Sequence, residues 1–216
     1  MSTNSITKEV WGIIRSDLAL QKDLARDTIN TRALARYILE RYPLKASIDS
    51  VISAIRRFEG SESFQETEKK ITNVFKECVI LTKNNIASAT LKKEAEKSIP
   101  LICTIKDLNI NNTFKIITGS KHIKIIADQS HIKEILARLS DKLLEKTEED
   151  LSELSITMSE KAIKTRGVLA RIANEISLAG INIEEMIICP PEFLIYVKQE
   201  DIIKTYESVL KLRARE

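Results

Sequence analysis

The stretch TRGVLARIANEISLAGINIEEMIICPPEFLIYVKQEDIIKTYESVLKL, residues 165–212, decides the fold of this chain. The spacing of its apolar residues changes along the stretch and divides it into four elements. They are a helix over 165–179, strands over 181–188 and 193–197, and a helix over 200–212. Gly180 is placed to end the first helix, and Pro190-Pro191 to turn the chain between the strands. With the strand-like LSITM at 154–158 in front, the order is β-α-β-β-α.

An earlier stretch repeats this order roughly 70 residues upstream, a period that indicates two copies of one supersecondary unit. IASATL at 86–91 corresponds to LSITM, and HIKIIAD at 122–128 corresponds to EFLIYVK at 192–198. With one more strand, each copy is the ferredoxin-like split βαβ arrangement, which packs helices on one face of an antiparallel sheet. The last strand of the second copy is either absent or borrowed from another element.

The remaining elements of the first copy follow from the same periodicities. We expect strands over 78–82 and 86–91, a helix over 98–108, a hairpin of 113–118 with 122–127, a helix over 130–144 and a solvated acidic linker over 145–150. The hairpin turns at Gly119-Ser120.

Residues 1–60 show helical spacing only. The expected helices cover 6–15, 18–26 and 30–42, a fourth begins after Ser47, and a polar connector helix follows over 61–76. Asn30 or Thr31 caps the third helix, Pro43 ends it, and Gly60 is placed to stop the fourth.

The second copy closely resembles ACT domains, especially those of the C-terminal regulatory region of aspartokinases. The signature is Gly167-Val168 at the helix start, AGINI at 179–183, a hydrophobic hairpin, and the acidic pair Glu200-Asp201 before the last helix. The first copy resembles the family through its pattern and the repeat. INTRALARYILERYPLKASIDSVISAIRRFE, residues 29–59, resembles the helix-turn-helix part of winged-helix proteins. The combination resembles archaeal ACT-containing proteins of unknown function.

These resemblances imply an α+β chain with an N-terminal helical domain, helix-turn-helix-like, followed by two tandem ferredoxin-like βαββα(β) ACT modules. The expected division is a helical domain over 1–60, a connector helix and strand over 61–84, a degenerate ACT-like module over 85–145 and an ACT module over 151–216.

ACT modules usually bind amino acids or similar effectors where two modules pair, and the loop before the first helix supplies much of the pocket. The resemblance therefore implies effector-binding residues Ser159, Glu160, Lys161, Lys164, Thr165, Arg166, Gly167, Val168 and Asn182. Gly167 would let the backbone approach a ligand, and the helix start would present N–H groups to a carboxylate. The basic side chains add positive charge, and Glu160 could meet an ammonium group. The alternative is that both modules serve only as a dimerisation scaffold. The matching loop of the first copy, 92–97, lacks glycine, so we expect no ligand there.

The helix from Ser47 to Arg57 is the expected DNA-recognition helix, because a helix in the major groove needs short polar side chains and basic residues. The candidate DNA-binding residues are Thr31, Arg32, Lys45, Ser47, Ser50, Ser53, Arg56 and Arg57. The alternative is a helical cap that packs on the ACT sheets with its arginines in solvent.

Composition excludes several classes of protein. Hydrophobic residues make up 43% and charged residues 30% of the chain, so it is globular rather than disordered. The net charge of +3 permits nucleic-acid contact without requiring it. Cys78, Cys103 and Cys189 are odd in number and widely spaced, which favours buried free thiols over disulfides or zinc. No hydrophobic leader or membrane-length apolar run occurs, so we expect a soluble, cytoplasmic protein.

No enzyme motif stands out. The sequence contains no phosphate-binding loop, nucleophile elbow, zinc-peptidase motif or dinucleotide fingerprint. His122 and His131 have no nucleophile pattern nearby. We therefore expect no catalytic residues, no cofactor and no metal. The expected function is a homodimeric, amino-acid-sensing transcriptional regulator. The alternative is a regulatory or scaffold subunit that docks on an enzyme of amino-acid metabolism without binding DNA.

Overall fold

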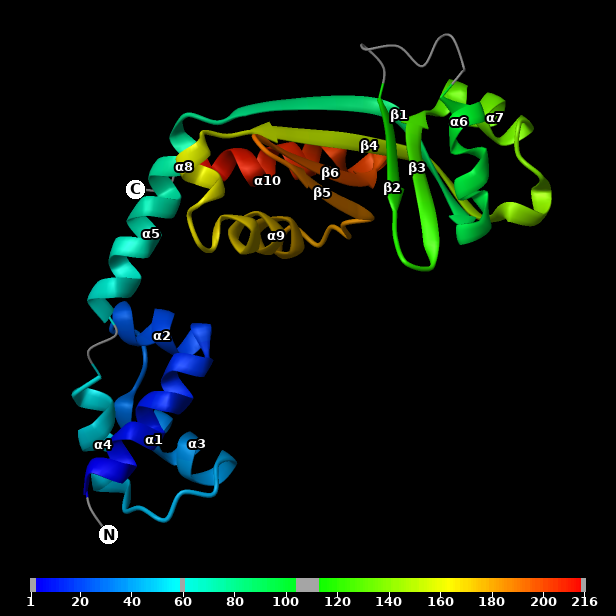
Figure 1. The fold of residues 1–216 in the computed structure, drawn as a ribbon. Helices are drawn as coiled ribbons and strands as arrows, with labels where there is room; N and C mark the ends of the chain where they lie inside the picture. The colour runs from blue at the N-terminus through cyan, green and yellow to red at the C-terminus, as the bar shows by residue number, and fades with distance from the viewer. Residues whose placement is uncertain (1–2, 59–60, 104–112, 215–216) are drawn as a thin grey trace. The chain divides into compact units, whose positions relative to one another are not determined.

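The computed structural model describes residues 3–58, 61–103 and 113–214, with 3–5, 61–65 and 214 described by backbone alone. The chain forms two compact units, Met1–Lys70 and Ile71–Glu216. Each is described by itself below, with elements labelled as in Figure 1.

The N-terminal unit is helical, as predicted. Its helices are α1 (Thr3–Ser16), α2 (Leu18–Ala25), α3 (Thr31–Arg41), α4 (Ile48–Arg56) and the first part of α5 (Ser61–Lys76). The side chains of Asp17, Asn30 and Ser47 cap α2, α3 and α4 by accepting backbone N–H bonds. The apolar stripes of α1, α3 and α4 meet in one core around Ile14, Ile38 and other aliphatic side chains.

The second unit is built on a six-stranded antiparallel sheet of order β2-β3-β1-β4-β6-β5. Its strands are β1 (Val79–Lys92), β2 (Phe114–Thr118), β3 (His122–Asp128), β4 (Leu144–Thr157), β5 (Glu185–Cys189) and β6 (Glu192–Lys198). Its helices are α6 (Ile99–Ile102), α7 (Gln129–Ala137), α8 (Glu160–Ile163), α9 (Val168–Leu178) and α10 (Ile202–Ala214). The long strands β1 and β4 run through the middle (Figure 1).

The two long strands each serve two modules. The second half of β1 pairs with β3 and with the first half of β4, which completes a four-stranded sheet for the first module. The first half of β1, Val79–Lys83, pairs with Thr157–Glu153 of β4, which pairs in turn with β6. The second module therefore borrows its last strand from the segment that precedes the first module.

A left-handed residue marks the place where each long strand passes from one module to the other. Asn85 has a φ of 58° and Asp150 a φ of 55°. The backbone N–H of Asn85 donates to Gln199 Oε1 at 3.2 Å, and that of Asp150 donates to Gln129 Oε1 at 3.0 Å. Gln129 and Gln199 directly follow β3 and β6. The two crossovers are thus stabilised by matching contacts in the two halves of the repeat.

In each module, helices cover one face of the sheet. The opposite faces of the two modules, which carry no helices, pack against each other. In the second module, Ile156 and Ile195 pack against Ile172 of α9 and Val209 of α10. On the opposite face, Ile86 and Ile126 of the first module form a cluster with Leu151, Leu194 and Tyr196. The sheet must curl to allow this contact, because β3 and β6 are not neighbours in the strand order.

Several expected boundaries are wrong. The strands expected over 78–82 and 86–91 are one strand, β1, whose register against β4 shifts first between Lys83 and Ile86. The expected acidic linker over 145–150 is instead part of β4, an edge strand of the first module, where charged side chains are tolerated because one side faces solvent. The helix expected over 130–144 ends at Ala137, and the strand expected over 181–188 begins at Glu185.

Other expectations are confirmed or lie partly outside the described residues. The hairpin of β2 and β3 and the final hairpin and helix form as predicted. Gly180 takes a left-handed φ of 73° after α9, as its helix-ending position requires. The helix expected over 98–108 begins as a 3₁₀ turn over Lys93–Ser98 followed by α6, and its part beyond Cys103 is not described. Cys78 is buried as expected, but Cys103 and Cys189 are exposed.

Candidate functional site

The loop between β4 and α9 is the candidate effector site, and its own hydrogen bonds shape it. The Met158 N–H donates to Pro191 O at 3.0 Å, which ties the loop start to the β5–β6 turn. Ser159 then begins the single turn α8, and the Thr165 hydroxyl donates to Lys161 O at 2.7 Å. Gly167 has a φ of 90° and starts α9. Because this conformation is strained for residues with a Cβ, glycine is favoured here.

The structure brings most of the predicted effector residues together. Ser159, Glu160, Lys161, Lys164 and Arg166 are exposed around the loop, and Thr165 is half-buried. The first N–H groups of α9 have no acceptor within their own helix, so this basic loop can attract an anion. Val168, in contrast, is only 2% exposed and belongs to the core.

Asn182 lies apart from this loop. It follows the far end of α9, whose 11 residues span about 16 Å. Its side-chain amide donates to Glu184 Oε1 at 3.2 Å. Within one chain, Asn182 is therefore not brought to the start of α9.

The Cβ side of Gly167 is occupied by the chain itself. A Cβ at this position would lie 3.0 Å from Cδ1 of Ile71 in α5. Ile71 and Phe75 are buried in one core with Ala162 of α8 and Val168 of α9. The close approach that the sequence suggested for a ligand at Gly167 is made here by Ile71.

A polar hollow lies beside the second crossover, which the sequence did not suggest. It measures about 560 Å³ and is lined by Glu149, Asp150, Lys198, Gln199 and Glu200. No spacing in the sequence brings 149–150 next to 198–200, so only the fold reveals it. Within the described ranges, no group of three or more acidic, histidine or cysteine side chains could hold a metal ion.

The interface between the helix-free faces contains buried charge. Lys115 Nζ lies 2.7 Å from Glu153 Oε2, and the Tyr196 hydroxyl donates to the same oxygen at 2.5 Å. Burial raises the pKa of the Tyr196 hydroxyl far above its usual range, and the adjacent Glu153 carboxylate adds to the rise. Lys124 also pairs with Glu185, so charged contacts cross between the modules.

The charged contacts of this interface extend to β4, because Lys124 Nζ also lies 3.8 Å from Glu148 Oε2. Lys146 donates to Glu148 at 2.7 Å, and this hydrogen bond lowers the pKa of the Glu148 carboxyl and raises that of Lys146. Glu148 also accepts a hydrogen bond from Ser88 at 3.4 Å.

The candidate DNA-binding residues divide into exposed and internally bonded groups. Arg32, Lys45, Ser53 and Arg56 are exposed. Ser47 accepts the N–H of Ser50, and their hydroxyls lie 2.8 Å apart, so these two polar groups bond each other.

The remaining two predicted DNA-binding residues are more constrained. Arg57 donates to Ser53 O at 3.1 Å and reaches Thr7 of α1 at 3.4 Å. Thr31 is half-buried at the first turn of α3.

Helix α3 carries further exposed side chains that the sequence reasoning missed. Arg36, Tyr37 and Arg41 are exposed on α3 together with Arg32. The i, i+4 spacing of Arg32 and Arg36, and of Tyr37 and Arg41, could have indicated a basic helix face.

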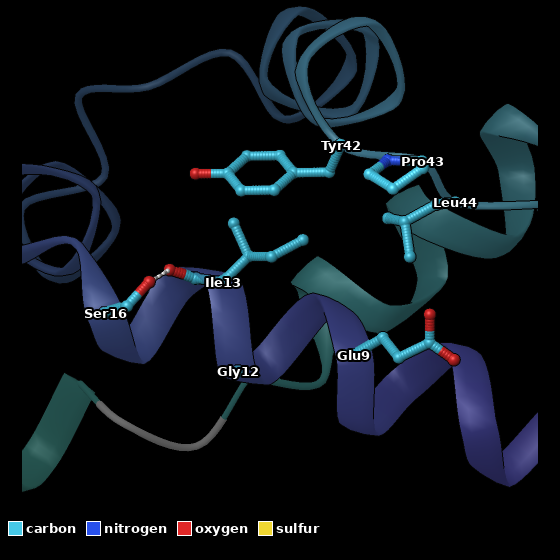
Figure 2. Close-up of a pocket in the computed structure, with 7 residues that line it drawn as sticks. All are labelled: Glu9, Gly12, Ile13, Ser16, Tyr42, Pro43 and Leu44. Carbon is cyan, nitrogen blue, oxygen red and sulfur yellow. Dashed lines mark hydrogen bonds between the residues drawn. The ribbon is translucent and has the colours of Figure 1, made fainter.

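A hollow of about 360 Å³ opens between α1 and the turn after α3 (Figure 2). Its lining residues are Glu9, Gly12, Ile13, Ser16, Tyr42, Pro43 and Leu44. Figure 2 shows the Tyr42 ring and Leu44 above the helix, with Ile13 below the ring. Gly12 leaves the helix surface open, because a Cβ there would meet no atom within 4 Å.

Structural comparison identifies the fold. The chain is similar to the aspartate kinase of Clostridium acetobutylicum, with 16% identity, a TM-score of 0.50, and coverage of 62% of this chain and 34% of that one. It thus spans about a third of that enzyme. It is also similar to the regulatory subunits of aspartate kinase from Thermus thermophilus and Thermus flavus, with 14% and 12% identity and TM-scores of 0.51 and 0.52. Each of these comparisons covers 62% of this chain and 95% of the other.

At these identities the similarity shows a shared ACT-type fold, which confirms the expected α+β arrangement of the C-terminal region. No family model and no curated protein matches the chain. Among the residues that the structure describes, no helix is long and apolar enough to cross a membrane.

Proposed function

We propose that this chain is a ligand-responsive regulatory protein that binds an amino acid at the loop before α9. The observation that carries the proposal is the exposed basic loop, with Lys161, Lys164 and Arg166, next to the N–H groups that open α9 in an ACT-type fold. The carboxylate of the amino acid would bind the N–H groups at the start of α9, and Glu160 would contact its ammonium group. The proposed site comprises Ser159, Glu160, Lys161, Lys164, Thr165, Arg166, Gly167 and the backbone N–H of Val168, whose side chain lies in the core.

The proposed active form is a homodimer. Asn182 would then act on the loop of the partner copy, since it is far from the loop of its own chain. The free edge of the first half of β1 supports this assembly. Among the described strands, this half-strand pairs with β4 alone, and its residues Val79 and Leu81 are 53% and 62% exposed. The matching edge of the first module, over 145–150, is charged instead. Charged edges resist strand pairing, whereas an apolar edge permits it.

We further propose that the N-terminal helices bind double-stranded DNA in a helix-turn-helix manner. Exposed basic residues on α3 and near α4 would contact phosphates, and Ser53 and Arg56 on the outer face of α4 would face base edges. An effector would then change DNA affinity through the dimer.

The alternative is docking on an enzyme of amino-acid metabolism. The hollow lined by Ile13, Tyr42 and Leu44 favours it, because an apolar side chain of a protein partner would fit there (Figure 2).

A thermal-shift screen against each of the standard amino acids tests the effector function. A ligand at a hundredfold excess over its Kd stabilises the folded protein by about 2.7 kcal/mol. The variant Arg166→Ala should lose the shift, whereas Lys204→Ala, an exposed lysine on α10, should retain it. A chain that shows no shift with any amino acid would contradict the proposal.

Salt dependence separates DNA binding from docking. Binding of duplex DNA should weaken steeply as salt rises, because phosphate contacts release counterions. Arg56→Ala should reduce affinity, and the exposed Lys8→Ala on α1 serves as the control. Co-purification of a metabolic enzyme, lost on Tyr42→Ala but not on Arg56→Ala, would favour docking instead.

A further inference from the structure

The end of α5 is part of the core that supports the effector loop. Ile71 is 6% exposed and Phe75 is 1% exposed, and both share one apolar cluster with Ala162 within the loop and Val168 at its end. Beyond α5, the carbonyl of Cys78 accepts a hydrogen bond from Arg213 of α10. Strand β1 begins at the next residue. The end of α5 therefore packs against the loop, and the chain just beyond it is hydrogen-bonded to α10.

Ile71 and a ligand cannot both occupy the open side of Gly167. A Cβ at Gly167 would already lie 3.0 Å from Ile71 Cδ1, closer than ordinary van der Waals contact. A ligand atom that contacts the Gly167 backbone from this side would lie farther out than a Cβ, inside the volume of Ile71. In this structure Ile71 therefore occupies the Cβ side of Gly167, while the glycine remains exposed elsewhere.

We propose that Ile71 is a built-in competitor for the effector, and that an amino acid bound at Gly167 displaces the end of α5. The inference rests on the proposed effector function of the loop. Helix α5 spans the boundary between the two compact units, which falls after Lys70. Displacement of Ile71 would therefore act on the helix that joins the N-terminal unit to the sheet unit, so occupancy of the loop becomes a signal along the chain.

Competition of this kind lowers the apparent affinity for the effector. The measured Kd equals the intrinsic Kd divided by the fraction of molecules in which Ile71 has left the loop. Shortening the Ile71 side chain reduces the apolar burial that holds this side chain against Gly167. The affinity should then rise as the side chain becomes smaller.

Titration calorimetry on the full chain tests the competition. The probe is the amino acid that gives the largest thermal shift in the screen above. Ile71→Ala should bind it more tightly than the unchanged protein, on the order of tenfold, and Ile71→Val should show a smaller gain. Val209→Ala removes buried volume from the same core on α10 and should leave the affinity unchanged.

Amide hydrogen exchange tests whether ligand binding loosens the end of α5. The amides of 71–76 should exchange faster when the amino acid is added, although the protein as a whole is stabilised. An unchanged or weaker affinity of both Ile71 variants, or slower exchange over 71–76, would overturn the competition while leaving the effector function in place. If the thermal-shift screen finds no amino acid that binds the unchanged protein or either Ile71 variant, the effector function and this inference fail together.

Discussion

Glycine has opposite roles at two positions of this chain. Gly167 has a φ of 90° and lies against Ile71, whereas Gly12 lies in the interior of α1 with open space beside it. Gly167→Ala should therefore lower the free energy of unfolding of the sheet unit by about 1–2 kcal/mol. Gly12→Ala should raise that of the helical unit by about 1 kcal/mol, because alanine favours the helix. Urea unfolding of both variants measures these changes, and an effect of the same sign in both would contradict the argument.

The buried Tyr196 hydroxyl predicts a pH dependence of stability. In the unfolded chain tyrosine ionises near pH 10, whereas in the folded protein burial keeps Tyr196 neutral. Above pH 10 the folded state then binds more protons than the unfolded state, so the free energy of unfolding falls as pH rises, by about 1.4 kcal/mol per pH unit. Tyr196→Phe should remove this slope.

The control for this prediction is Tyr206→Phe, which alters a half-buried tyrosine of the same unit. Urea unfolding of all three proteins between neutral pH and pH 11 gives the comparison, since other groups titrate in each and cancel. Parallel curves for the unchanged protein and Tyr196→Phe would contradict the role of Tyr196.

At the scale of elements, the edges of the sheet predict how the chain assembles. Leu81→Lys places a charge on the exposed apolar half of β1 and should weaken strand pairing between copies. Sedimentation velocity should then show a shift from dimer to monomer. Ile203→Lys, which replaces an exposed apolar residue on α10 rather than on a strand, should leave the proposed dimer intact. Equal behaviour of the two variants would place the dimer contact elsewhere.

The sequence predicts elements well where burial is one-sided and poorly where a strand changes partners. The stripe of α9 and the alternation of β6 face a single core, so their spacing is clear. Asn84-Asn85 interrupts the alternation of β1 because the strand bulges there, and the result looks like two strands. Glu145–Asp150 looks like a linker because an edge strand needs few apolar side chains.

The candidate site was predictable in part for a similar reason. The basic residues and Gly167 are contiguous in sequence, so their proximity follows from chain connectivity alone. The contact of Ile71 with Gly167 joins positions that are far apart in the sequence, and no periodicity reports it. The bonding of Ser47 to Ser50 likewise depends on the capping geometry of α4, which the sequence indicated for Ser47 only.

At the scale of the whole molecule, the single tryptophan separates the two units. Trp11 lies in the helical unit, where its indole donates to Ala54 O at 2.9 Å and its ring packs on Phe58. Its fluorescence therefore reports the unfolding of that unit alone. The difference in tyrosine absorbance between the unchanged protein and Tyr196→Phe reports the sheet unit, because Tyr196 lies there. An amino acid that binds the effector loop should raise the unfolding midpoint of this difference signal more than the midpoint of tryptophan fluorescence. Equal shifts would mean that the units unfold together.

The borrowed strand has a consequence for how the two modules depend on each other. The first module is a continuous guest, since its four strands lie between Ile86 and Leu151. The second is a discontinuous host, whose outermost strand, Val79–Lys83, lies on the other side of the guest in the chain. A cut at Asn84 would therefore leave the guest's own strands uninterrupted while detaching a strand from the host. Any fragment that begins after this point should expose the edge at Glu153–Thr157 and lose the C-terminal module first.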